Sequence, residues 1–128
     1  SGDARPELKA ERELLTTALA DVEAMVGTCF EHLMAAQEDS KRLYIIGLAS
    51  VRLLMGFGDL VMGWRLLEGA EVALGALDGA SGDDKTFYTG KIEAAKWFAH
   101  NELPLLTATR GIVANLGAGL MEMDEAAF

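Results

Sequence analysis

The hydrophobic positions of this chain concentrate in one long run, from Leu43 to Leu77, in which Arg52 and Asp59 are the only charged residues before Trp64. Apolar residues occupy nearly every side of a helix drawn through this run. A helix that is apolar all round is normally buried all round. The pattern therefore predicts a central helix over residues 41–78, with the flanking helices packed around it.

One face of this expected helix carries small side chains. Ala49, Gly56, Gly63 and Ala70 recur every seven residues. A glycine inside a helix costs roughly 0.5–1 kcal/mol relative to alanine, so it usually marks a place where another backbone comes close. We therefore expect a tight helix crossing on this face. A ligand cleft over the glycines, or a kink at residues 56–58 that would divide the helix, are the alternatives.

Arg52 and Asp59 lie on the same stripe. Neither has an opposite charge three or four residues away, the spacing at which two side chains meet on a helix. Because a buried charge requires a partner, we expect each of them to pair with another helix or to face water at an interface. A structural ion pair or polar contact is the simpler interpretation, and a functional binding pair is the alternative.

Amphipathic helices are predicted on both sides of the central one. Pro6 suits a first helical turn, and a stripe of apolar residues then predicts a helix over residues 6–37. The stripe consists of Leu8, Leu15, Leu19, Val22, Val26, Cys29, Leu33 and Ala36. The acidic residues of this helix, Asp21 among them, are expected to lie mostly away from it. A second stripe predicts a helix over residues 84–116, kinked at Pro104 because proline lacks the backbone donor.

These elements predict an all-α protein, an up-and-down bundle of three long helices. The number becomes four if the central helix breaks near residues 56–58 or if the third helix breaks at Pro104. Nothing in the sequence reads as a linker, so we expect a single helical domain over residues 1–128. The tail, residues 117–128, alternates apolar and acidic residues and would either fold back onto the bundle or await a partner.

The net charge of −9 argues against a nucleic-acid partner, whose phosphates require a basic face, and against an anionic membrane surface. The central run is long enough to span a bilayer, but Arg52 and Asp59 in its middle argue against a membrane helix. The charged opening residues do not resemble a signal peptide. The lone Cys29 forbids an internal disulfide, so we expect a cytoplasmic protein.

Little in the sequence points to a reaction. His32 and His100 have no companion at a metal-ligand spacing, and no residues suggest nucleophilic catalysis or a dinucleotide site. Cys29 lies within an apolar stripe and is expected to be a small core residue. The residues themselves therefore predict no catalytic, cofactor-binding or metal-binding position.

Several short motifs stand in order along the chain. They are Gly63-Trp64-x-Leu66, Phe87-Tyr88-Thr89-Gly90-Lys91-Ile92, Ala94-Ala95-Lys96-Trp97-Phe98, Leu103-Pro104 and Met123-Asp124-Glu125-Ala126-Ala127-Phe128. Together they resemble the helical C-terminal extension of bacterial acyl-CoA dehydrogenases, the acetyl-CoA dehydrogenase C-terminal-like region. The resemblance covers the chain from about Leu8 onward.

This resemblance implies a parent flavoprotein that oxidises the α,β carbons of an acyl-CoA with FAD and passes electrons to an electron-transfer flavoprotein. The domains that hold FAD and the catalytic glutamate have no counterpart in these residues, so no such position carries over. The resemblance implies a domain that associates with the remainder of the dehydrogenase chain, and we expect the enzyme to be a homo-oligomer. Tyr88 and Lys91 match the family pattern. We expect a packing and tethering role for Tyr88, with substrate contact as the alternative, and the role of Lys91 is open, an interface being one candidate.

Two further functions are open from the residues alone. The chain could be a free-standing helical module that dimerises to complete a bundle. It could instead bind a small acyl ligand between its helices, with the glycine stripe as the floor of an apolar pocket.

Overall fold

The computed structural model describes residues 5–128 and contains no β-strand within that range. Its α-helices, in chain order, are α1 (Lys9–Ala35), α2 (Arg42–Leu77), α3 (Gly82–Asn101) and α4 (Leu105–Ala114). Short 3-10 turns flank them as η1 (Pro6–Leu8), η2 (Gly119–Met121) and η3 (Glu125–Ala127). The predicted all-α bundle is confirmed, with the third helix divided in two.

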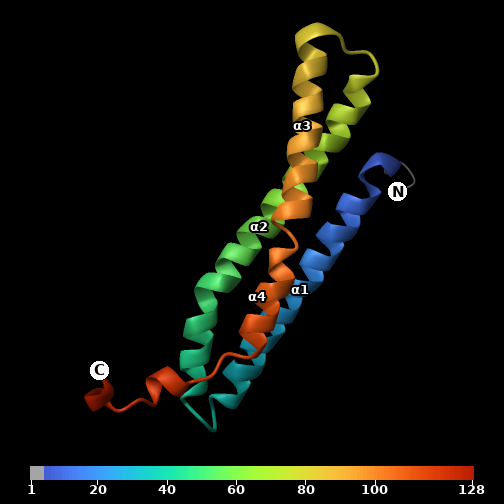
Figure 1. Ribbon diagram of the computed structural model, residues 1–128. Coiled ribbons are helices and arrows are strands. Elements are labelled where there is room, and N and C mark those ends of the chain that lie inside the picture. Colours follow the sequence, from blue (N-terminus) through green and yellow to red (C-terminus); the bar gives the residue numbers. More distant parts are fainter. Residues whose placement is uncertain (1–4) are drawn as a thin grey trace.

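The helix α2 runs the length of the molecule, and the other helices pack along it (Figure 1). α1 lies antiparallel to α2 over one half, and α3 forms a hairpin with the other half. α4 continues from α3 and lies against α1 and α2. The tail after α4 projects from the end of the bundle where α1 connects to α2 (Figure 1).

The small-residue face of α2 forms the tight crossing predicted for it. Ala49, Gly56, Gly63 and Ala70 are all buried, and α2 continues unbroken through residues 56–58. A Cβ atom added at Gly63 would lie 2.9 Å from Cδ2 of Leu103, and one added at Gly56 would lie 3.2 Å from Cδ2 of Leu106. The two glycines therefore make room for the side chains around the start of α4.

The break between α3 and α4 follows from Pro104, which has no backbone N–H to continue the helical ladder. The backbone N–H groups of Glu102 and Leu103 both donate to the carbonyl oxygen of Phe98, at 2.9 and 3.3 Å. The chain turns inward at this point, and Leu103 becomes fully buried. The proline thus positions the side chain that fills the space above Gly63.

The expectation that α2 is buried on nearly all sides is wrong. Only 17% of an apolar stretch of 18 residues within α2 is buried. Val51, Leu54 and Val72 are 67%, 70% and 73% exposed. The neighbouring helices cover one side of α2, and the opposite side faces solvent. By length and composition alone, α2 would be apolar enough to cross a membrane.

The predicted stripe of α1 is only partly correct. Leu8 and Val22 are buried, but Asp21, expected to lie away from the core, is buried as well. The exposed members of the stripe are Leu19, Val26 and Leu33. The buried face of α1 is rotated toward α4, because Asp21 accepts hydrogen bonds from that helix.

Candidate functional site: an exposed apolar surface

An apolar groove runs between α1 and α2. One hollow, of about 330 Å³, is lined by Leu15, Thr16, Leu19, Leu60, Val61 and Trp64. A second hollow, of about 260 Å³, is lined by Cys29, Ile46, Ser50, Leu53, Leu54 and Phe57. None of these lining residues is charged. We refer to the two hollows together as the α1/α2 groove.

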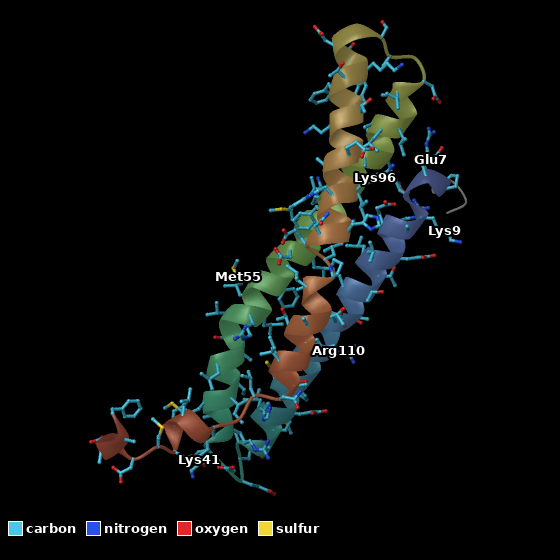
Figure 2. The ribbon with its side chains drawn as sticks, viewed as in Figure 1. Glu7, Lys9, Lys41, Met55, Lys96 and Arg110 are labelled. Atoms are coloured by element: carbon cyan, nitrogen blue, oxygen red, sulfur yellow. The ribbon has the colours of Figure 1, made fainter. Side chains whose placement is uncertain are left out.

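A second exposed surface lies along α2 itself. Its members are separated by three, four or seven residues and therefore share one side of the helix. We define this outer face of α2 as Gly47, Val51, Leu54, Gly58, Met62, Arg65, Gly69 and Val72, all of which are exposed. The neighbouring Met55 points away from α1 and α4 (Figure 2). Arg65 is the only charged residue of the outer face of α2, and its Nη1 atom lies 2.6 Å from a carboxylate oxygen of Glu68.

Five of the six glycines of α2 fall into two classes. Gly56 and Gly63 face the neighbouring helices, as described above. At Gly47, Gly58 and Gly69, an added Cβ would meet nothing within 4 Å. Each of these three carries the helix-propensity cost of glycine, roughly 0.5–1 kcal/mol, without any packing reason among the described residues.

The structure places Arg52 in solvent and Asp59 in a half-buried position. Neither forms an ion pair with another residue in the range 5–128. Arg52 therefore faces water, whereas Asp59 is half-buried without an ion-pair partner among these residues. Their role at an interface stays a prediction.

Tyr88 and Lys91 line an open groove of about 640 Å³ between α2 and α3, which also includes Gly69 and Arg65. The Tyr88 ring meets Phe87 edge-on, with centroids 5.6 Å apart. The Lys91 Nζ atom lies 5.3 Å from the centroid of the Phe87 ring. Tyr88 is half-buried and Lys91 is exposed, so Lys91 is accessible for contact with a partner.

The glycine stripe is not the floor of a ligand pocket. Leu103 and Leu106 occupy the space over Gly63 and Gly56. The hollows described above are open and lie on other sides of α2. The alternative of a ligand cleft over these glycines is therefore wrong, and the expected helix-packing contact is found there.

Two buried carboxylates that the sequence analysis did not select hold α1 against α3 and α4. Glu11 Oε1 lies 2.9 Å from Nε2 of His100 on α3. Asp21 accepts a hydrogen bond of 2.6 Å from the Thr107 hydroxyl and one of 3.2 Å from Arg110 on α4. Both acids share a helix face with the buried Ala18, and this heptad-like spacing was the signal that could have revealed them.

The electrostatic environment of Glu11 has opposing contributions. Burial raises its pKa, but the hydrogen bond from His100, a backbone hydrogen bond and the nearby cations lower it, and the net pKa lies below the usual 4.5. Burial alone raises the pKa of the Cys29 thiol, which makes it less reactive at neutral pH. No group of three potential metal ligands occurs within residues 5–128. The two carboxylates join α1 to α3 and α4 through the hydrogen bonds described above.

Comparison with known proteins agrees with the motif resemblance. The chain is 52% identical, over its whole length, to part of the broad-specificity linear acyl-CoA dehydrogenase FadE5 from Mycobacterium tuberculosis, of which it covers 21%. It thus spans about a fifth of that relative's length. The family described as "Acetyl-CoA dehydrogenase C-terminal like" matches residues 2–124. The chain belongs to this acetyl-CoA dehydrogenase C-terminal-like family.

Proposed function

We propose that this chain is the non-catalytic C-terminal helical domain of an FAD-dependent acyl-CoA dehydrogenase, and that it acts in association between domains or subunits in fatty acyl-CoA oxidation. One observation carries the proposal. α2 is apolar on all sides, yet the described helices bury only one of them. Large exposed apolar surfaces mark places where a protein contacts a partner.

The α1/α2 groove is the surface best suited to the remainder of the dehydrogenase chain. The lining of each of its two hollows is uncharged and comes from both helices. Burial of apolar area stabilises an interface by about 25 cal/mol per Å². The 21% coverage of FadE5 supports a parent polypeptide several times longer than this chain. FAD and the reacting groups would be held by those other domains.

The exposed surface favours a protein partner over a membrane or a nucleic acid. Arg52 and Asp59 lie midway along α2, where a bilayer would impose a high cost on a charge. The buried stripe of α2 is already covered by α1, α3 and α4. The net charge of −9 opposes binding to phosphate-rich surfaces. We place the parent enzyme in the cytoplasm as a homo-oligomer.

Site-directed thiol labelling tests this proposal. Thr16→Cys introduces a thiol at an exposed position of the α1/α2 groove, and Glu31→Cys introduces one at an exposed position of α1 outside it. The alkylation rate at each site is measured by peptide mass spectrometry, in the 128-residue chain and in the parent dehydrogenase.

We expect the Thr16→Cys thiol to react at least tenfold more slowly in the parent enzyme, and the Glu31→Cys thiol to react equally in both. Equal rates at Thr16→Cys in the two contexts would show that the groove stays open and would overturn the proposed docking of the enzyme body.

A further inference from the structure

We propose that two copies of this chain pair through the outer face of α2, antiparallel, about a twofold axis that passes at Gly58. The inference rests on the association function proposed above and names one partner for it, a second copy of the same chain. The rest of the α1/α2 groove, which shares Leu54 with the outer face, is left for the remainder of the dehydrogenase.

The first support is the repetition of open glycines. Gly47, Gly58 and Gly69 are spaced 11 residues apart, and an added Cβ at any of them would meet nothing within 4 Å. An 11-residue repeat follows nearly one line along a helix, because it corresponds to about 3.67 residues per turn. Open glycines also occur on α1 at Gly27, on α3 at Gly82 and Gly90, and on α4 at Gly111, but none of these helices carries three of them at a regular spacing.

The second support is the symmetry of the spacing. In an antiparallel pair centred on Gly58, each residue lies opposite the one equally far on the other side of the centre. Gly47 then faces Gly69, and Gly58 faces its own copy. The remaining pairs are Leu54 with Met62, Val51 with Arg65, and Tyr44 with Val72. Apolar side chains meet in the Leu54–Met62 and Tyr44–Val72 pairs, the charged Arg65 lies opposite Val51, and no like charges meet.

A twofold, self-complementary surface is what pairing of identical chains requires. The surface of a different domain would place no symmetry requirement on the glycine positions. The side chains between the glycines are also among the most exposed apolar groups of the molecule, with Leu54 at 70%. A helix packed against the three glycines would cover them.

The open groove beside Gly69 fits the same arrangement. It is about 640 Å³ in volume and includes Gly69, Val72, Tyr88 and Lys91. In the antiparallel register, the first turns of the partner's α2 lie over this region. The exposed Leu43 and Tyr44 would supply the apolar side chains that enter it.

The first experiment measures the self-association of the 128-residue chain by sedimentation equilibrium over a wide concentration range. Gly58→Leu places a bulky side chain at the centre of the contact, where the isolated chain has open space. Gly27→Leu makes the same change at an open glycine of α1. We expect a dimer whose Kd rises at least tenfold in Gly58→Leu and stays unchanged in Gly27→Leu.

A monomer at all concentrations, or a dimer that is insensitive to Gly58→Leu, would overturn the pairing. The Thr16→Cys labelling tests the association with the enzyme body independently of either result. A failure of the pairing can therefore be distinguished from a failure of the proposed function. Circular dichroism of both leucine variants verifies that each is folded.

The second experiment tests the register by disulfide formation in a Cys29→Ala background. Gly58→Cys should cross-link to itself, whereas Gly47→Cys should cross-link to Gly69→Cys when the two variants are mixed. Cross-linking of Gly47→Cys with itself would indicate a parallel pair and contradict the proposal. The same variants are also tested in the parent dehydrogenase. If Gly58→Cys does not cross-link there, and if Gly58→Leu detaches the domain from the enzyme body, the outer face of α2 contacts the body and not a second copy.

Discussion

At the scale of single residues, Glu11 and Asp21 set the orientation of α1. Asp21 is almost fully buried and receives hydrogen bonds from Thr107 and Arg110. Glu11 is buried beside His100. Each acid joins segments far apart in the sequence, so their hydrogen bonds help to select the face of α1 that is buried.

Removal of the Asp21 carboxylate should destabilise the fold. Asp21→Ala eliminates a charged acceptor from a buried position and leaves its two donors without their acceptor, so we expect the free energy of unfolding to fall by about 1–3 kcal/mol. Urea denaturation measures this change. Glu23→Ala, at an exposed position of the same helix, is the control and should change stability by less than about 0.5 kcal/mol. Equal effects of the two variants would contradict a structural role for Asp21.

The lowered pKa of Glu11 makes a specific prediction about acid stability. The unfolded chain takes up a proton near the usual value of 4.5, whereas the folded chain does so at lower pH. The stabilisation from Glu11 is therefore complete above that value and is lost as pH falls through the folded pKa. Stability measured between about pH 7 and pH 3 should decline less steeply in Glu11→Gln than in the wild-type chain. An unchanged slope would show that Glu11 does not contribute.

At the scale of the helix, α2 has two kinds of surface. Its inner face uses Gly56 and Gly63 to admit Leu106 and Leu103. Its outer face repeats glycine where the described chain offers no contact. The same residue type therefore has a packing role on one side and points to an intermolecular contact on the other.

Alanine substitution should separate these roles. Gly63→Ala gains helix propensity, but its Cβ would lie 2.9 Å from Leu103, and overpacking of this kind typically costs about 1–3 kcal/mol. Gly27→Ala meets no neighbour and should stabilise the chain by up to about 1 kcal/mol. Thermal and urea unfolding of both variants provide the comparison. Stabilisation by Gly63→Ala would show that the crossing at Leu103 is looser than described.

At the scale of the whole molecule, an acidic chain carries an apolar surface that its own helices do not cover. The net charge of −9 makes two copies repel one another, while the outer face of α2 favours their contact. The stability of a dimer therefore depends on the balance between the charge repulsion and the burial of this apolar face.

Salt should therefore strengthen self-association. Raising the ionic strength from about 0.1 M to 1 M shortens the screening length from about 10 Å to about 3 Å and weakens the repulsion between the chains. We expect the Kd from sedimentation equilibrium to fall as sodium chloride is added. A Kd that rises with salt would indicate that ion pairs, and not the apolar face, hold the copies together.

The sequence by itself determined the helical class, the break at Pro104 and the crossing at Gly56 and Gly63. These features follow from local chemistry: periodic apolar residues, a missing backbone donor and missing side chains. The motifs around Tyr88 and Lys91 also pointed to the correct family.

Only the tertiary structure decided which apolar residues are covered. Burial depends on how many neighbours a helix has and on which side they pack, and a pattern that is apolar all round carries no information about either. For this reason the central helix was expected to be buried on nearly all sides and Leu54 lies in solvent, whereas Asp21 was expected away from the apolar stripe and lies in the core. The exposed side of α2, on which the proposed function depends, became visible only when the positions of α1, α3 and α4 were known.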